Sequence, residues 1–152
     1  MTRGSWLHGK IVLNAGVLLR LYARANPGWS CAVADPGTKL AADPVILRGP
    51  DVGVVRTERE PKGTGADGWL DGAPDVAVEV IGGSQSHAEL AKKALEYLAA
   101  GAKMVWVIDP DAQKVILYTP PNQIRVLASD EILDGADVLP GFRCRVAEFF
   151  EG

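Results

Sequence analysis

Residues 75–81, with the sequence Asp-Val-Ala-Val-Glu-Val-Ile, constrain the fold more than any other segment of this 152-residue chain. A short and nearly continuous run of β-branched residues is typical of a strand buried on both faces of a sheet. In extended geometry Glu79 shares one face with Asp75 and Ala77, while valines occupy the other face. The run therefore predicts a central strand that carries a carboxylate, Glu79, inside the core.

A buried Glu79 needs a physical explanation. An ionised carboxylate inside a core is costly unless it is paired or binds a metal ion. Two other interpretations stay open at this stage. Glu79 could lie on a sheet edge with its head in solvent, or it could belong to a buried ion pair.

The rest of the chain alternates helical and β-like segments. Amphipathic periodicity predicts helices over residues 8–25 and 86–100. Apolar runs between turn residues predict strands over residues 30–34, 45–47, 52–55, 103–108, 114–118, 123–127 and 142–145. Residues 57–72 are charged and contain four glycines, which predicts a surface loop or a mobile flap. This order predicts one α/β (α+β) domain over residues 1–152, with helices packed on a mixed β-sheet that is not doubly wound.

The second predicted helix carries a lysine that could face the Glu79 strand. On the helical wheel Lys93 lies at the edge of the apolar face, one turn before Tyr97, whereas Lys92 points nearly the opposite way. Lys93 can therefore reach the end of the strand that leads into this helix. A surface pair with Glu89 four residues earlier explains Lys93 about equally well.

Asp51 is a third candidate, because it follows Pro50 and opens an apolar strand. Taken alone, it is better explained as a turn aspartate that accepts hydrogen bonds from local backbone amides. His8 and His87 lie near the starts of the two helices, on their apolar sides, and partly buried histidines with satisfied hydrogen bonds explain both best. Two histidines cannot form a His-rich zinc site.

Residues 82–86, Gly-Gly-Ser-Gln-Ser, follow a strand and open a helix. Backbone amides in such a position could bind a phosphate group. The segment lacks the lysine pattern of a P-loop and the spacing of a dinucleotide fingerprint. A flexible connection is therefore the preferred interpretation.

The net charge of −3 and the sequence pI of about 5.4 count against a large basic patch for nucleic acid. A bound divalent cation can nevertheless offset local acidity.

The apolar stretch over residues 11–21 is interrupted by Asn14 and Arg20 and is too short for a bilayer, so we expect a cytoplasmic protein without a membrane partner. Leu13 and Val17 lie on the polar side of the first helix, either as a homodimer contact or as two stray exposed side chains.

Several motifs together resemble the Uma family of endonucleases, which belongs to the PD-(D/E)XK nuclease superfamily with the restriction-endonuclease-like fold. The resemblance covers nearly the whole chain and includes His-Gly at residues 8–9. The other motifs are Pro-Asp-Val-Gly-Val-Val at 50–55, Ala-Pro-Asp-Val-Ala-Val-Glu-Val at 73–80, Lys-Ala-Leu-Glu-Tyr-Leu-Ala-Ala-Gly at 93–101, Val-Trp-Val-Ile-Asp-Pro at 105–110, Leu-Pro-Gly-Phe at 139–142 and Val-Ala-Glu-Phe-Phe at 146–150.

The resemblance implies that Asp51 and Glu79 are metal-binding carboxylates for Mg²⁺ or Mn²⁺. The superfamily lysine commonly lies two residues after the acid, where this chain has Ile81, and the family resemblance moves it to Lys93 on the next helix. Asp35 falls where members often carry an acidic residue, which makes it an additional candidate.

The implied activity is metal-dependent hydrolysis of phosphodiester bonds in nucleic acid, with DNA as the favoured substrate. In that reaction Lys93 would orient the attacking water or stabilise developing negative charge. Members often have a glutamate just before the His-Gly pair, where this chain has Leu7. This difference and the acidic pI favour an alternative, a catalytically impaired nucleic-acid-binding or regulatory module that retains the fold.

Overall fold

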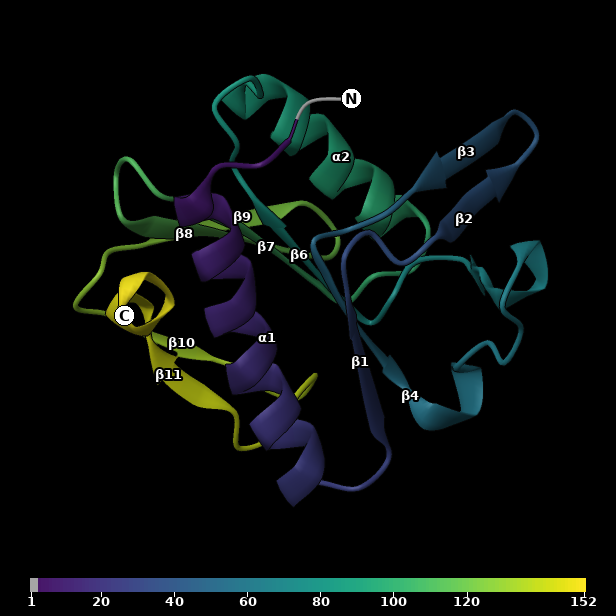
Figure 1. The fold of residues 1–152 in the computed structure, drawn as a ribbon, viewed down its shortest axis with the longest axis horizontal. Helices are drawn as coiled ribbons and strands as arrows, with labels where there is room; N and C mark the ends of the chain where they lie inside the picture. Colours follow the sequence, from purple (N-terminus) through teal and green to yellow (C-terminus); the bar gives the residue numbers. More distant parts are fainter. Residues whose placement is uncertain (1–2) are drawn as a thin grey trace.

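A six-stranded mixed sheet forms the centre of the computed structural model, which describes residues 3–152 (Figure 1). The strand order is β1-β4-β6-β7-β8-β9, and only the β6–β7 pair is parallel. The mixed sheet predicted from the sequence is therefore confirmed. The strands are β1 (Trp29–Val33), β4 (Val52–Arg56), β6 (Val76–Val80), β7 (Met104–Asp109), β8 (Lys114–Thr119) and β9 (Gln123–Leu127).

One helix covers each face of this sheet (Figure 1). Helix α1 (Trp6–Ala25) packs against β1, β4 and β6, and α2 (His87–Ala99) packs against β7 and β8. Each helix begins after a serine cap, since the hydroxyls of Ser5 and Ser86 accept hydrogen bonds of 3.1 Å from backbone amides three residues later. Because Ser5 is the cap, α1 begins two residues earlier than predicted. No helix within residues 3–152 is long and apolar enough to cross a membrane.

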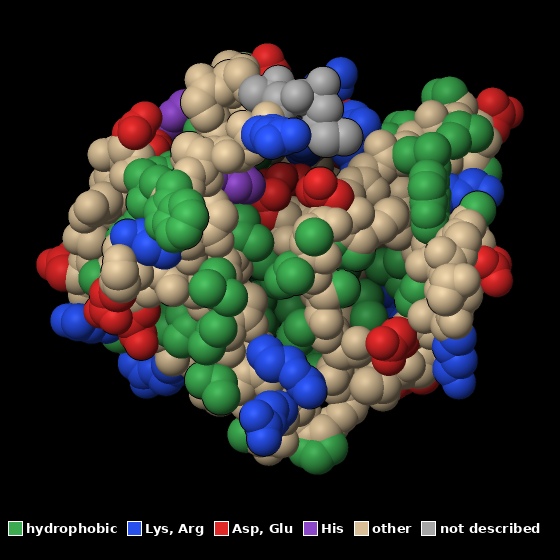
Figure 2. Space-filling view, viewed as in Figure 1, with side chains coloured by type: hydrophobic (Ala, Val, Ile, Leu, Met, Phe, Trp, Pro, Cys, Tyr) green, Lys and Arg blue, Asp and Glu red, His purple; other side chains and the backbone are tan. Residues whose placement is uncertain are grey.

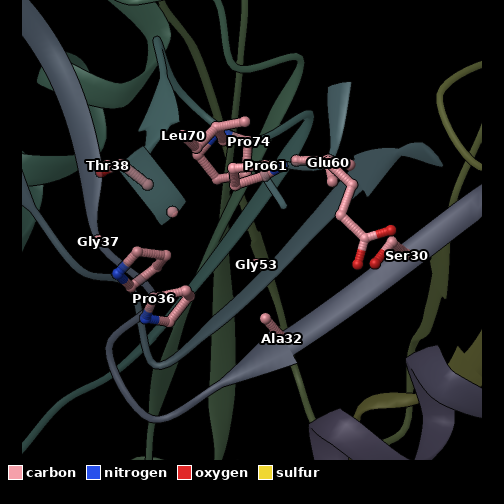
Figure 3. A pocket seen from close by; sticks show the side chains of 13 residues that line it. Ser30, Ala32, Pro36, Gly37, Thr38, Gly53, Glu60, Pro61, Leu70 and Pro74 are labelled. Carbon is pink, nitrogen blue, oxygen red and sulfur yellow. The ribbon is translucent and has the colours of Figure 1, made fainter. Parts of the chain in front are cut away.

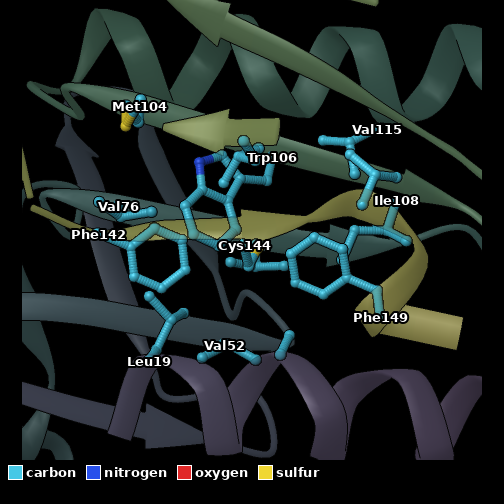
Figure 4. Packing of buried hydrophobic residues seen from close by; sticks show 14 of the residues in the cluster. Leu19, Val52, Val76, Met104, Trp106, Ile108, Val115, Phe142, Cys144 and Phe149 are labelled. Carbon is cyan, nitrogen blue, oxygen red and sulfur yellow. The ribbon is translucent and has the colours of Figure 1, made fainter. Parts of the chain in front are cut away.

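The larger core lies on the α1 face of the sheet and is centred on Trp106 (Figure 4). Its ring packs against Phe142 and Phe149, with centroids 5.4 Å and 6.0 Å away. These phenylalanines come from the C-terminal part of the chain, which completes this face of the molecule. Its elements are β10 (Ile132–Asp134), β11 (Arg143–Arg145) and the 3-10 helix η3 (Val146–Phe150).

A small second sheet stands beside the α2 face, with the strand order β3-β2-β5. Its strands are β2 (Thr38–Ala42), β3 (Val45–Arg48) and β5 (Leu70–Asp71). Only β3 is predicted from the sequence, because β2 lacks β-branched residues after Thr38 and β5 has only two residues. Strand β10 was not predicted either, because it has only three residues. Pairing with neighbouring strands, β3 and β5 for β2 and β11 for β10, makes these segments strands where local propensity does not.

Residues 57–72, predicted to form a surface loop or a flap, contain regular structure. They hold two 3-10 helices, η1 (Thr57–Arg59) and η2 (Ala66–Gly68), and end in β5. Arg59 ties the start of this segment to the sheet: it pairs with Asp75 at 3.1 Å and donates a 2.7 Å hydrogen bond to the carbonyl of Ala73. The segment is therefore anchored at η1.

Candidate active site

Asp51 and Glu79 lie at the same end of neighbouring strands. Strands β4 and β6 are antiparallel, with Val52 opposite Val78. Extending this register by one residue places Asp51 opposite Glu79. Side chains alternate along a strand, so both carboxylates face α2 together with Ala77, which belongs to the core cluster on that side. Two of the residues predicted from the sequence are thus brought together by strand pairing.

The Asp51 carboxylate does not cap a local turn, contrary to the interpretation favoured for it alone. Its Oδ2 atom accepts a 2.7 Å hydrogen bond from the backbone amide of Val80, which is 29 residues away in the sequence. The same oxygen lies 3.4 Å from Nε2 of His8. Burial raises the pKa of Asp51, while the Val80 amide and the His8 side chain act in the opposite direction. Asp51 therefore links α1, β4 and β6.

Glu79 is 3% exposed and lies on β6, a central strand, so the sheet-edge interpretation is wrong. Its Oε1 atom accepts a 2.9 Å hydrogen bond from the hydroxyl of Tyr97 on α2. Within residues 3–152 no ion pair joins Glu79 to a cationic side chain, so the second alternative, a buried ion pair, also fails. Burial raises the pKa of Glu79 to about 7; the charge of Lys93 lowers it and the charge of Asp51 raises it.

The two carboxylates open into a cavity of about 610 Å³ that Lys93, Asp35 and His8 also line. Figure 2 shows acidic side chains beside a histidine at the upper end of the hollow on this face. Lys92 is exposed, as the helical wheel predicted, and within the described residues no ion pair joins Lys93 to Glu89. Residues 82–85 form part of the rim.

The available donor atoms determine which metal ion the site fits. Within residues 3–152 no group of three or more His, Cys, Asp or Glu side chains is arranged to hold a metal ion. Asp51 and Glu79 each use one oxygen in a hydrogen bond, while Asp51 Oδ1 and Glu79 Oε2 accept none from the described residues and are not sealed from solvent. Mg²⁺ is commonly held by one or two carboxylates, with waters and substrate phosphates completing its shell. The donor set fits such a hard divalent cation.

Sequence reasoning missed two contacts of this site. His8 was expected to be partly buried with its hydrogen bonds satisfied. It is partly buried, and its Nε2 atom lies 3.4 Å from the Asp51 carboxylate, a contact that the sequence did not predict. Tyr97 was noted only as a position on the wheel, and the structure places its hydroxyl on Glu79. His87 differs from the expectation of partial burial, because its side chain is 63% exposed and lies 3.5 Å from Asp109. Only the strand and helix packing brings these pairs together.

A mixed sheet with a helix on each face, and with carboxylates at one strand end, is the architecture of the restriction-endonuclease-like class. Residues 1–147 match the family model Uma2, described as "Putative restriction endonuclease", and the chain belongs to this family. Its fold is similar to that of a protein from Anabaena variabilis ATCC 29413, described as a putative nuclease belonging to DUF820. The TM-score is 0.82 at 21% identity, over 99% of this chain and 82% of the other. A search of the curated proteins found no match. Family and fold together support a nuclease.

Proposed function

We propose that this protein is a metal-dependent endonuclease that hydrolyses phosphodiester bonds of nucleic acid, with DNA as the favoured substrate. The observation that carries the proposal is the meeting of Asp51, Glu79 and Lys93 in one cavity. Two acids and a lysine are the groups that a metal-assisted phosphodiester hydrolase needs. They come from three separate parts of the chain: Asp51 directly precedes β4, Glu79 lies on β6 and Lys93 lies on α2.

Each side chain has a distinct role in this reaction. Asp51 and Glu79 would hold Mg²⁺ or Mn²⁺ through their free oxygens. When bound, such a cation supplies Lewis-acid chemistry, polarising a phosphoryl oxygen and making a water more acidic. Lys93 orients the attacking water or stabilises the negative charge that develops on the phosphate. His8 lies against Asp51 and holds that carboxylate in place.

Because the chain carries a net charge of −3, the bound cation is expected to contribute to substrate binding as well as to the reaction. Two carboxylates in one cavity repel a phosphate group until a divalent cation neutralises them. Lys93 and Arg3 also line the cavity and add positive charge there. Nucleic acid is therefore expected to bind this site much more tightly with the divalent cation than without it.

The test is cleavage of single- and double-stranded DNA by the purified full chain, with Mg²⁺, with Mn²⁺ and with EDTA. We expect cleavage that requires the metal and that falls at least about 100-fold in Lys93→Ala, because removing one charge-stabilising group typically costs this much. Lys92→Ala is the matched control, since Lys92 is the neighbouring lysine and points to solvent. Equal loss in both variants, or unchanged cleavage by Lys93→Ala, would remove Lys93 from the reaction.

A non-catalytic module is the competing function, favoured by Leu7 at the position where relatives often carry an acid. Leu7 lies in the first turn of α1, next to His8, and is 42% exposed. Nucleic-acid binding without cleavage in any metal, together with no binding of Mg²⁺ or Mn²⁺ that depends on Asp51 and Glu79, would support this alternative.

We also propose a homodimer through the exposed apolar side chains of α1. Leu13, Val17 and Leu21 are 63%, 47% and 57% exposed, and Val33 on β1 continues the patch. A sedimentation experiment over a wide concentration range tests the proposal. We expect dimers for the wild-type protein and monomers for Val17→Asp, and a monomeric wild-type protein at high concentration would exclude the dimer.

A further inference from the structure

A second cavity lies beside the acidic site, on the same face of the central sheet. It has a volume of about 190 Å³. Its floor includes Gly53, which lies two residues beyond Asp51 and therefore points to the same face of the sheet. At the usual rise of a strand the two residues are separated by roughly 7 Å. Pro36 and Pro50 in its wall directly adjoin Asp35 and Asp51 of the first cavity, so the two cavities are neighbours.

The walls of this cavity are rigid and mostly apolar. Pro36, Pro61, Pro74 and Leu70 surround the floor at Gly53 in Figure 3. A Cβ atom at Gly53 would meet ring carbons of three prolines at 3.6–3.7 Å. The missing side chain at Gly53 therefore creates the space, and proline rings cannot rearrange to fill it. A cavity of this kind fits a flat ring with apolar faces.

Two polar residues of the cavity, Glu60 and Ser30, lie together on one side, while the hydroxyl of Thr38 on the other side donates a 2.9 Å hydrogen bond to the carbonyl of Arg48. The Glu60 side chain extends toward Ser30, on the side opposite Pro36 and Gly37 (Figure 3). Glu60 is well positioned, because it directly follows Arg59, which is anchored to Asp75 and Ala73. An ionised carboxylate only accepts hydrogen bonds. A ring that enters this cavity therefore needs a donor group on the edge that faces Glu60.

We infer that this cavity binds one unpaired nucleobase of the substrate strand, next to the scissile phosphate, with Glu60 accepting a hydrogen bond from an exocyclic amino group. The inference rests on the proposed function, which places a phosphate at the neighbouring carboxylates. Nucleobases are flat rings with apolar faces and polar edges, and enzymes that bind them outside the stack combine apolar walls with hydrogen bonds to the base edge. Adenine, cytosine and guanine carry an exocyclic amino group, whereas thymine does not.

The inference also defines the form of the substrate. A base paired in a duplex cannot enter a side pocket without leaving the stack, which costs the free energy of unpairing and unstacking. Single-stranded DNA, or a duplex with an unpaired position, avoids this cost. The protein is therefore expected to prefer a strand that is unpaired beside the cleavage site, with a base other than thymine at that position.

The experiment measures binding without cleavage, by fluorescence anisotropy of labelled oligo-dA, oligo-dC and oligo-dT in buffer containing EDTA. Removing the cation weakens phosphate binding equally for the three oligonucleotides, so the ratio of their affinities still reports on the base. We expect the wild-type full chain to bind oligo-dA and oligo-dC about tenfold more tightly than oligo-dT, the size expected for one hydrogen bond to a charged group. Glu60→Gln should abolish this preference, because an amide can both donate and accept. Glu58→Gln is the matched control, since Glu58 lies on η1, two residues before Glu60, but outside the cavity.

A second variant tests the shape of the cavity. Gly53→Val should fill the floor and weaken binding of all three oligonucleotides about tenfold or more, with a preserved circular dichroism spectrum. Glu60 is exposed, so Glu60→Gln tests the inference even if Gly53→Val fails to fold. A base preference that survives Glu60→Gln, or a wild-type protein that binds oligo-dT as well as oligo-dA and oligo-dC, would overturn the inference.

The two proposals fail separately in these experiments. Mg²⁺-dependent cleavage without a Glu60-dependent base preference would leave the nuclease intact and exclude the base pocket. A Glu60-dependent preference in EDTA, without cleavage in any metal, would retain the pocket and exclude the catalytic function.

Discussion

The hydroxyl of Tyr97 donates a 2.9 Å hydrogen bond to Oε1 of Glu79, inside the core between α2 and β6. Both side chains are almost completely buried. This bond stabilises the ionised form of a carboxylate whose burial favours the neutral form, so it partly offsets the raised pKa of Glu79. The tyrosine thus supports the charge state in which Glu79 can bind a cation.

Removing this hydroxyl should weaken metal binding. We expect Tyr97→Phe to raise the pKa of Glu79 further and to lower Mn²⁺ affinity at pH 7 by about tenfold, the order expected for one hydrogen bond to a charged group. Isothermal titration calorimetry measures the effect. Tyr118→Phe is the control, because Tyr118 belongs to the same core cluster and its hydroxyl makes no hydrogen bond within the described residues. Equal Mn²⁺ affinity of Tyr97→Phe and the wild-type protein would contradict the role of the bond.

Metal affinity should depend steeply on pH around neutrality. The pKa of Glu79 is about 7, so the folded protein carries a protonated Glu79 below that pH. The proton must leave before a cation binds, and Mn²⁺ affinity should fall by up to about tenfold for each pH unit below the pKa. Affinity should become nearly constant above pH 8. Titrations between pH 5.5 and 8.5 measure this dependence, and a flat profile over the whole range would contradict the raised pKa.

Glu79 should destabilise the fold at high pH. Its pKa is higher in the folded state than in the unfolded chain, so the folded state binds more protons between about pH 4.5 and 7 and loses stability as pH rises through that window. We therefore expect Glu79→Gln to increase the free energy of unfolding by up to about 3 kcal/mol at pH 8 and by little below pH 4.5. Urea denaturation at both pH values provides the measurement. A variant that is less stable than the wild-type protein at pH 8 would show that contacts in the folded protein already offset the free-energy cost of burying the ionised Glu79 side chain.

Arg59 should stabilise the wall of the second cavity. Asp75 is 4% exposed and forms an ion pair with Arg59 at 3.1 Å. Its Oδ2 atom also accepts a 3.0 Å hydrogen bond from the backbone amide of Arg56. Arg59→Ala should cost about 1–3 kcal/mol, because a buried charge loses its closest cation while the Arg56 amide remains. Thermal unfolding measures the loss. Arg125→Ala is the control, since Arg125 forms only a 3.9 Å surface pair with Glu131, and an equal loss in both variants would rule out a special role for Arg59.

The central strand and its acid could be predicted because burial dictates local composition. A strand covered on both faces must be made of apolar, β-branched residues, so β6 is evident in the sequence and Glu79 stands out within it. The amphipathic pattern of α2 likewise predicted that Lys93, and not Lys92, faces the strand. These inferences need only periodicity, which each segment carries on its own.

Contacts between distant segments could not be predicted, because they depend on strand register and helix packing. The sequence alone favoured a turn role for Asp51, whereas antiparallel pairing of β4 with β6 brings it opposite Glu79. It contained no signal for the contact of His8 with Asp51, which depends on how α1 crosses the sheet. Local composition was thus enough to predict the buried strand and the burial of Glu79. The groups that contact Glu79 and Asp51 follow only from the folded chain, because those distances arise from the packing of segments far apart in the sequence.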